Sequence, residues 1–418
     1  MQKIKLGDVL DVKRGASLSG DYYAEEGKYV RLTLGNFNYP GGGFKENTSK
    51  SDIYFVGPIK PEFILNEGDI ITPLTEQVSG LLGETATIPE GGKYIQSGDV
   101  GLVIPDETKL DKRFAYYLIA SPIVRKQLDA AAQQTKIRHT SPDAIKACEA
   151  WIPEDISVQA SIGRLLDSIN EKIANNNAIC ANLEAMAKLL YDYWFVQFDF
   201  PDENGKPYKS SGGKMVWNDE LKREIPAGWE VKPLRDVCSI VLGGTPKTEK
   251  SEYWNGDINW LNSGEVAQFP VVETELKITQ QGLDNSATVL MPVGTVIISI
   301  TGNLRVSFLA IDTCGNQSIV GIMENEFYKK SYLYPVLKDL LAVYNRVATG
   351  NCQQHISKGT IEESFMLCPP SSVMFEYRNK VDPVFDRIIE LGHENQQLVS
   401  LRDFLLPMLM NGQVKVGA

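Results

Sequence analysis

The sequence predicts an α+β protein made of two tandem domains, each a mixed sheet of short strands with helices and each followed by a long α-helix. Two observations carry this prediction. An ordered series of motifs occurs twice along the chain, and a heptad pattern of apolar residues follows each copy. We expect the two long helices to pair as an antiparallel coiled coil, so that pseudo-two-fold symmetry relates the two halves.

The duplicated motifs keep one order and nearly one spacing. They pair Leu6-Gly7-Asp8-Val9 with Leu234-Arg235-Asp236-Val237, Gly15-Ala16-Ser17 with Gly243-Gly244-Thr245, Leu65-Asn66-Glu67-Gly68-Asp69-Ile70 with Leu290-Met291-Pro292-Val293-Gly294-Thr295-Val296, Gln96-Ser97 with Gln317-Ser318, and His139-Thr140-Ser141 with His355-Ile356-Ser357. Chance produces scattered matches rather than an ordered series, so we infer a duplicated unit. The copies have diverged heavily, which suggests one task performed on two different objects.

Turn residues and apolar runs divide the chain into five segments. We expect a first domain at 1–153, a central helix at 154–197, a linker at 198–228, a second domain at 229–370 and a C-terminal helix at 371–412. Strands are expected at 30–34, 69–72 and 100–104 in the first domain, and at 257–261, 295–300 and 318–323 in the second. Apolar spacing predicts one helix over 112–128.

Both long helices carry two interleaved apolar series seven residues apart, which is typical of a coiled-coil seam. The expected seam residues are Ile162, Leu166, Ile169, Ile173, Asn176, Leu183, Leu190, Ile388, Leu391, Asn395, Leu398 and Leu405. Ser157 is the expected N-cap of the first helix. Pro383 either kinks the second helix or marks its first turn. Asn176 and Asn395 either fix the register of the pair or are polar breaks in long core helices.

Composition limits the possible functions. The chain has 42 Lys plus Arg against 53 Asp plus Glu, a net charge of −11, which argues against a stand-alone nucleic-acid binder but permits basic loops or partner-supplied phosphate contacts. Six cysteines without a Cys-x-x-Cys pair fit small core residues in a reduced compartment. Without a signal peptide or an apolar run that could cross a bilayer, we expect a cytoplasmic protein with no membrane contact.

The sequence lacks the motifs of common catalytic sites. It has no Gly-x-x-x-x-Gly-Lys-Ser/Thr loop for nucleotides and no Asn/Asp-Pro-Pro-Tyr/Phe tetrapeptide of amino-methyltransferases. The acidic segment Asp106-Glu107 fits a surface turn better than a nuclease metal site, because its carboxylates are adjacent. We therefore expect no catalytic residue, no bound metal and no cofactor on this chain.

Two related domains held apart by a helical pair resemble a dimeric DNA-binding protein, except that the two recognition domains differ in sequence. Polar, glycine-containing loops supply the donors and acceptors that base readout needs. The candidate DNA contacts are Lys13, Arg14, Ser17, Gln133, Gln134, Lys136, Arg138, His139, Thr245, Lys247, Asn303, Arg305, Asn351, Gln353, Gln354, His355 and Lys358. For His139 and His355 a cap or packing role is an equal alternative.

Longer motifs resemble the specificity (S) subunits of Type I restriction–modification systems. Residues 225–237, Ile225-Pro226-Ala227-Gly228-Trp229 through Leu234-Arg235-Asp236-Val237, match the family's IPxGWxxxxLxDV opening of a target recognition domain. Residues 189–196 are similar to the end of its central helix, 401–412 to its LRDxLLPxLxxG close, and 252–261 to a common strand entry. The resemblance covers essentially the whole chain, although the first domain lacks the tryptophan found at Trp260.

The resemblance implies a non-enzymatic subunit that reads a bipartite, asymmetric target on double-stranded DNA, one half through each recognition domain. It implies two modification (methyltransferase) subunits as partners, which would bring S-adenosylmethionine. It also implies motor and endonuclease subunits, which would bring ATP and magnesium. The helical pair would set the spacing of the two half-sites and dock the modification subunits.

Three other readings remain open at the level of the sequence. The chain could be a non-catalytic module that binds a protein or carbohydrate, with exposed Tyr253 and Trp254 lining a ligand groove. It could be an orphan specificity subunit that borrows the methyltransferase of another system. A nuclease or methyltransferase acting alone has little support, because its motifs are missing.

Overall fold

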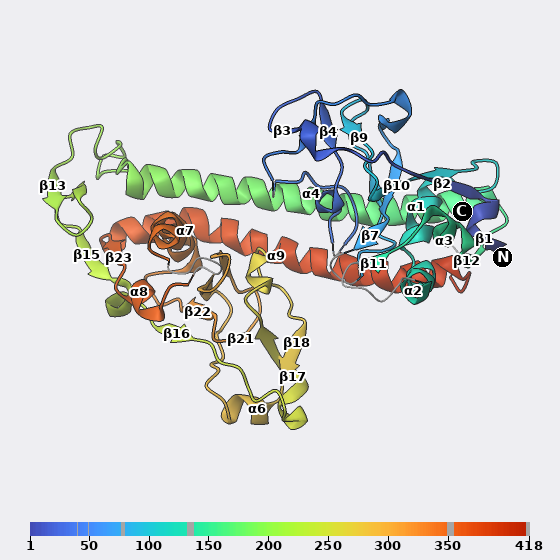
Figure 1. Cartoon of the computed structure of the whole chain (residues 1–418). Coiled ribbons are helices and arrows are strands. Elements are labelled where there is room, and N and C mark those ends of the chain that lie inside the picture. Colours follow the sequence, from blue (N-terminus) through green and yellow to red (C-terminus); the bar gives the residue numbers. More distant parts are fainter. Residues whose placement is uncertain (40, 49, 77–79, 132–137, 349–354, 415–418) are drawn as a thin grey trace. The chain divides into compact units, whose positions relative to one another are not determined.

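A computed structural model covers residues 1–418 and describes all of them except 40, 49, 77–79, 132–137, 349–354 and 415–418. The chain forms two compact units: unit 1 contains residues 1–173 and 398–418, and unit 2 contains residues 174–397. The boundary falls inside two long helices, α4 (Ile156–Tyr191) and α9 (Ser371–Met410), shown in green and red in Figure 1. Each unit therefore consists of one domain and a section of both helices.

The domain of unit 1 contains many short strands and three helices. Its strands are β1 (Gln2–Lys5), β2 (Leu10–Arg14), β3 (Tyr23–Ala24), β4 (Tyr29–Arg31), β5 (Tyr54–Phe55), β6 (Ile70–Pro73), β7 (Thr75–Glu76), β8 (Ala86–Thr87), β9 (Tyr94–Ile95), β10 (Val100–Pro105), β11 (Arg138–His139) and β12 (Glu149–Ile152). Its helices are α1 (Lys112–Ala120), α2 (Pro122–Ala131) and α3 (Pro142–Ala147). The helices pack on β2, β6 and β10 around a core that includes Leu6, Phe114 and Leu118.

The domain of unit 2 has a similar content. Its strands are β13 (Met215–Asn218), β14 (Arg223–Pro226), β15 (Glu230–Pro233), β16 (Ile240–Leu242), β17 (Trp254–Leu261), β18 (Leu276–Ile278), β19 (Val296–Ser299), β20 (Val306–Phe308), β21 (Thr313–Gly315), β22 (Ile319–Ile322) and β23 (Phe365–Cys368). Its helices are α5 (Leu234–Val237), α6 (Gln280–Asp284), α7 (Lys330–Val347) and α8 (Lys358–Glu362). Its main core contains a group of aromatic side chains in mutual contact, among them Phe195, Tyr332 and Tyr377.

The same topology occurs in both units, which confirms the predicted duplication. Sheet β2-β10-β6-β8 of unit 1 has the order and antiparallel pairing of sheet β16-β22-β19-β20 of unit 2. The antiparallel ribbon β1-β12 corresponds to β15-β23, and the parallel pair β4-β9 corresponds to β17-β21. Five of the predicted strands occur near their expected bounds, whereas the one expected at 30–34 ends at Arg31, because residues 34–36 form a 3-10 helix.

Backbone hydrogen bonds give the register between the two copies. The amide of Gly15 donates to the carbonyl of Val100, and the amide of Gly243 donates to the carbonyl of Ile319. Val100 of β10 and Ile319 of β22 are therefore equivalent positions, each in the strand that pairs with the first strand of its sheet.

The predicted match of Gln96-Ser97 with Gln317-Ser318 is wrong by two residues, because this register makes Gln96 equivalent to Gly315. The two glutamines also behave differently. Gln96 is buried and its amide nitrogen donates to the carbonyls of Lys13 and Val100, whereas Gln317 is exposed and accepts a hydrogen bond from the Thr245 hydroxyl. Gln96 and Gln317 therefore have different structural roles, although the sequence around them is similar.

The long helices α4 and α9 run antiparallel where they pack in unit 2. The Asn176 side chain donates to Asn395 Oδ1 at 2.9 Å, and the rings of Trp194 and Tyr377 are 5.7 Å apart. Moving from Asn176 to Trp194 along α4 thus corresponds to moving back by as many residues along α9. The described side chains of the predicted seam are buried at Ile162, Leu166, Ile169, Asn176, Ile388 and Leu391, and half-buried at Ile173, Leu183, Leu190, Asn395, Leu398 and Leu405.

Several expected boundaries differ in the structure. The predicted helix at 112–128 is two helices, because Ser121 adopts an extended conformation before Pro122. The N-cap of α4 is Asp155, whose carboxylate accepts the amide of Ser157 at 2.7 Å, and Ser157 lies in the first turn. Pro383 lies inside α9, more than a turn from its start. Within 198–228 the chain is not only a connection, since β13 and β14 form a hairpin.

Candidate nucleic-acid interface

Two exposed cations stand at the end of β2 in unit 1. The Lys13 side chain makes no hydrogen bond or ion pair with the residues described, while the Arg14 guanidinium donates to the carbonyls of Gly98 and Thr140 at 3.2 and 3.3 Å. Both side chains line a cavity of about 510 Å³ together with Phe63. Cations beside an aromatic ring are the chemistry that nucleic-acid sites use for phosphates and bases.

A glycine follows this strand end in each unit because another segment lies against its backbone. A Cβ atom on Gly15 would lie 2.2 Å from the carbonyl oxygen of Ser97, and one on Gly243 would lie 2.2 Å from that of Asn316. No larger residue fits at either position. The Gly15 and Gly243 motifs are therefore structural supports for the loops that follow them, where Ser17 and Thr245 are exposed.

His139 and His355 occupy the same place in the two units. His139 pairs with Thr75 of β7, and His355 forms an isolated bridge with Thr301, whose hydroxyl lies 3.2 Å from its Nδ1. Both imidazoles are exposed, and each histidine is paired through its backbone with a threonine. The structure thus gives each histidine a local backbone pairing and leaves its ring accessible.

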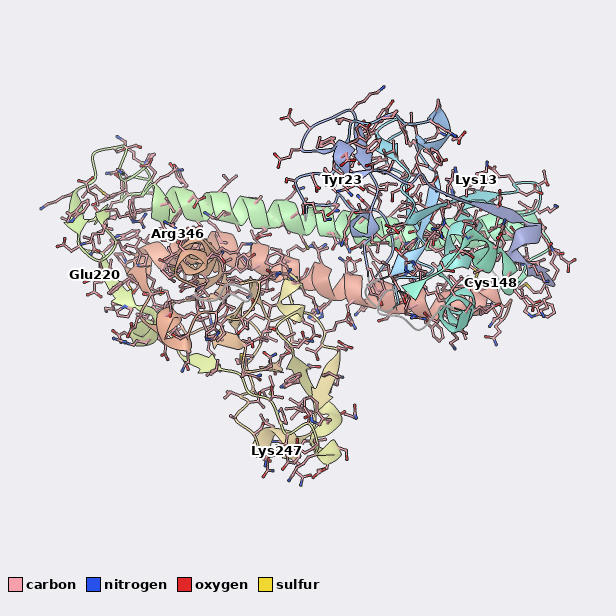
Figure 2. All side chains as sticks on the ribbon, viewed as in Figure 1. Lys13, Tyr23, Cys148, Glu220, Lys247 and Arg346 are labelled. Atoms are coloured by element: carbon pink, nitrogen blue, oxygen red, sulfur yellow. The ribbon has the colours of Figure 1, made fainter. Side chains whose placement is uncertain are left out.

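In unit 2 the candidate loops are held by their backbones, with side chains exposed. The carbonyl of Lys247 accepts from the Trp254 indole at 3.3 Å, and the carbonyl of Asn303 accepts from the Ser299 hydroxyl at 2.8 Å. The Lys247 and Arg305 side chains make no hydrogen bond or ion pair with any residue that the structure describes. Figure 2 shows Lys247 at the α6 end of its domain. These two cations are free to contact a ligand.

Two predicted contacts are engaged inside the protein. Arg138 forms ion pairs with the buried carboxylate of Glu76 at 2.6 Å and with Asp129 at 3.3 Å. Lys358 pairs with Glu362 one turn along α8 at 2.9 Å. Both side chains therefore have a structural role, and a DNA phosphate would have to compete with the carboxylate that each one already pairs with.

Six predicted contacts lie outside the described residues. They are Gln133, Gln134, Lys136, Asn351, Gln353 and Gln354. All of them belong to the two segments that immediately precede Arg138 and His355.

The acidic segment after β10 is a surface turn. Asp106 accepts hydrogen bonds from the amide and hydroxyl of Thr108 and pairs with Lys109 at 2.9 Å, and these contacts lower the pKa of its carboxyl to about 2. Within the described ranges, no group of histidine, cysteine and carboxylate side chains is arranged to hold a metal ion. None of the helices described is long and apolar enough to span a membrane.

The aromatic groove expected for a ligand-binding module is not formed by Tyr253 and Trp254. Tyr253 is buried, and Trp254 packs edge-on against Trp260 with ring centroids 5.1 Å apart. The prediction that these rings are exposed is wrong, because Tyr253 is buried and Trp254 is half-buried against a small core that contains Trp260 and Ile278. Conversely, no motif points to Phe63, because its place beside Lys13 depends on tertiary packing of distant segments.

Comparison with known proteins identifies the family. Residues 1–185 and 226–372 match the family described as "Type I restriction modification DNA specificity domain". The chain belongs to this family. Each matched segment contains one of the two duplicated domains, and the first also includes most of α4, so the resemblance seen in the motifs is confirmed.

Named relatives and a solved structure agree with this assignment. The MjaIX specificity subunit of Methanocaldococcus jannaschii is 24% identical over 319 residues, which cover 75% of this chain and 71% of that protein. The HindI specificity subunit of Haemophilus influenzae is 23% identical over 374 residues, covering 77% and 81%. The fold resembles the crystal structure of a Type I system S subunit from M. genitalium, with a TM-score of 0.55, 15% identity and coverage of 98% and 96%.

Proposed function

We propose that this chain is the DNA-recognition subunit of a Type I restriction–modification complex. The domain of unit 1 reads one half of a bipartite, asymmetric target, the domain of unit 2 reads the other half, and α4 and α9 set the distance between them. The observation that carries this proposal is one fold present twice, with different side chains at equivalent exposed positions, in a chain of the specificity family.

The divergence of the two reading surfaces supports unlike half-sites. In the register set by Gly15 and Gly243, the cations Lys13 and Arg14 of unit 1 correspond to the apolar Val241 and Leu242 of unit 2. Unit 2 instead presents cations at Lys247 and Arg305. Direct base readout depends on which donors and acceptors face the groove, so surfaces this different suit different base sequences.

The acidic net charge is compatible with this function if partner subunits contact much of the DNA backbone. We propose two modification subunits as those partners, together with motor and endonuclease subunits. S-adenosylmethionine, ATP and magnesium would then be bound by the partners rather than by this chain. Such a complex would work in the cytoplasm.

Exposed apolar stripes on the long helices are suitable docking surfaces for the modification subunits. In unit 2, Met186 and Leu189 of α4 and Tyr193 of the π-helical turn that follows it keep helical spacing and are exposed, Leu189 by 70%. On α9 in unit 1, Leu401 and Phe404 are 45% and 61% exposed. Large apolar side chains on one face of a helix are typical of protein interfaces.

The decisive experiment combines the purified chain with its modification subunits. We expect a sequence-selective complex with double-stranded DNA whose affinity falls steeply with salt, and methylated adenines that map to one bipartite sequence in DNA from cells carrying the system. Binding that is equally strong on unrelated duplexes at every salt concentration, or methylation without a bipartite target, would contradict the proposal.

A further inference from the structure

Each domain meets the long helix that follows it at a small junction, and the two junctions are built from different residues. Counted back from the central asparagines Asn176 and Asn395, Gly163 of α4 and Asp382 of α9 occupy the same place. The positions of Gln159 and Arg378 correspond in the same way. Gly163 and Gln159 lie against the start of α1 in unit 1, and Asp382 and Arg378 lie against the start of α7 in unit 2.

In unit 1 the junction brings two helices into backbone contact. A Cβ atom on Gly163 would lie 2.7 Å from the Cβ of Arg113 and 3.2 Å from the amide nitrogen of Phe114. Gln159 is fully buried beside it, accepts the amide of Asp111 at 2.9 Å, and donates to the carbonyl of Lys109 at 3.2 Å. The start of α1 therefore rests directly on α4.

In unit 2 side chains replace this backbone contact. Asp382 accepts a short hydrogen bond from the hydroxyl of Ser331, which is buried in the first turn of α7. Arg378 donates to Asp382 at 3.1 Å and to the carbonyl of Glu326 at 2.5 Å. Unit 2 thus has a carboxylate and a guanidinium at the positions where unit 1 has Gly163, which has no side chain, and the neutral amide of Gln159.

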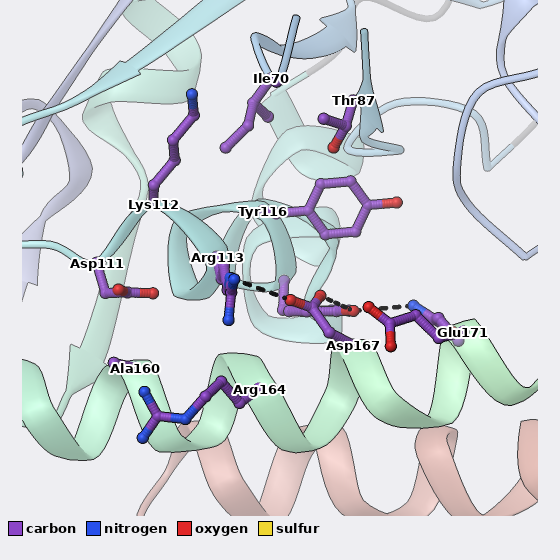
Figure 3. A pocket seen from close by; sticks show the side chains of 13 residues that line it. Ile70, Thr87, Asp111, Lys112, Arg113, Tyr116, Ala160, Arg164, Asp167 and Glu171 are labelled. Atoms are coloured by element: carbon purple, nitrogen blue, oxygen red, sulfur yellow. Dashed lines mark hydrogen bonds and ion pairs between the residues drawn. The ribbon is translucent and has the colours of Figure 1, made fainter. Parts of the chain in front are cut away.

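An ion pair flanks the junction in both units. Arg113 lies 3.4 Å from Asp167 of α4, and Lys330 lies 3.0 Å from Asp386 of α9, with Asp167 and Asp386 at equivalent places. In unit 1 this pair borders a cavity of about 700 Å³ between α1 and α4 (Figure 3). Beside this open space Tyr117 of α1 donates to Asp167 at 2.8 Å and accepts from Asn170 at 2.9 Å, so polar side chains also hold α1 at its distance from α4.

We propose that these junctions are positioning sites. They set the distance and the tilt of each recognition domain relative to its helix, and these determine which spacer length between DNA half-sites is accepted. This inference rests on the function proposed above. Helix length sets the coarse separation, whereas Gly163 with Gln159, and Asp382 with Ser331 and Arg378, adjust each domain independently. A small displacement at the junction is enlarged at the DNA-facing loops, because the domain moves as one packed body.

The test uses the full chain assembled with its modification subunits and duplexes carrying the mapped target with the native spacer or a spacer one base pair shorter or longer. The measured quantity is the ratio of methylation rates on native and altered spacers. Gly163→Ala inserts a methyl group where no space exists, so we expect it to lower this ratio at least tenfold. Ser331→Ala removes one hydroxyl with little change in volume, and we expect a reduction of about threefold.

Ser168→Ala, on the exposed side of the same helix, is the matched control and should keep the wild-type ratio. A purely structural role would slow methylation on all spacers equally and leave the ratio unchanged. That result in both variants overturns the inference, and Ser331→Ala alone decides if Gly163→Ala does not fold. If the wild-type complex methylates no bipartite target, the proposed function itself fails instead.

Discussion

At the scale of single residues, the structure separates cations that hold the fold from cations that can reach a ligand. Arg138 and Arg305 were equal candidates in the sequence, since both stand in polar loops next to other hydrogen-bonding residues. In the structure Arg138 neutralises the buried Glu76, whereas the Arg305 side chain is exposed and has no partner among the residues described. The difference arises from strand pairing between β11 and β7, which no local pattern reveals.

We expect Arg138→Ala to lower the free energy of unfolding by about 3 kcal/mol, because it leaves the Glu76 carboxylate buried without a counter-charge. Urea denaturation measures this change. Adding Glu76→Gln should recover part of the loss, since the buried charge is then gone. A loss no larger than that of Arg305→Ala would show that the pair is unimportant.

Arg305→Ala should change stability by less than about 0.5 kcal/mol and weaken binding to the native target by about 1–3 kcal/mol. The physical reason is that its guanidinium is exposed and available for phosphate or base edges. Fluorescence anisotropy at several salt concentrations distinguishes a phosphate contact from a base contact. A phosphate contact makes the salt dependence of binding shallower, whereas a base contact relaxes specificity at one target position. Unchanged binding would remove Arg305 from the interface.

Burial also controls the cysteines, and it predicts their reactivity. Desolvation raises the pKa of Cys238 to about 12 and the pKa values of Cys148 and Cys314 to about 11. In a Cys352→Ser variant at pH 8, we expect the native chain to react with Ellman's reagent at least about 100-fold more slowly than the urea-unfolded chain, whose thiols have pKa values near 8.5. Since the thiolate fraction rises with pH, the native rate should increase about tenfold per pH unit up to pH 10. A fast native reaction would contradict the burial of these thiols.

At the scale of elements, the long helices were predictable and the short strands and loop registers were not. The seam of α4 is readable because residues such as Ile162 and Leu166 repeat with a period that one helix face imposes. Strands of two residues, such as β7 and β11, carry no period and exist only through pairing with distant segments. For the same reason the sequence predicts polar loops as candidate DNA contacts but does not reveal that Arg138 is paired with Glu76.

The hydrogen-bonded asparagines of the seam give a prediction for the helix pair. Asn176→Ala removes the donor to Glu394 and Asn395, so we expect a loss of about 1–2 kcal/mol in unfolding free energy. The double replacement Asn176→Leu with Asn395→Leu should instead raise stability, because a fully apolar seam buries more surface while specifying register less well. The exposed neighbour Asn175→Ala is the control in the same denaturation experiments. If the double variant were as unstable as the single one, the pair would contribute stability rather than register.

At the scale of the whole molecule, the duplication predicts that recognition is modular. Each domain has its own sheet and core within its unit, so one can be exchanged without altering the fold of the other. Replacing residues 1–153 by the first domain of another specificity subunit should change one half of the methylated target and leave the second half as it was. Methylome sequencing checks this outcome, and a change in both halves would contradict independent reading.

The spacer between the half-sites should follow the length of the helix pair. Inserting one heptad into each long helix, next to Asn176 and Asn395, preserves the apolar seam because seven residues return to the same helix face. The insertion adds roughly 10 Å at ~1.5 Å per residue, which corresponds to about 3 base pairs of DNA at ~3.4 Å each. We therefore expect both half-sites to be retained and the spacer to lengthen by up to about 3 base pairs, as read from methylated adenines. Inserting a heptad of equal composition into the loop between β13 and β14 is the control, because it lengthens the chain without lengthening the helices, and it should leave the spacer unchanged. If the helix insertion also left it unchanged, the distance would be set by something other than the paired helices.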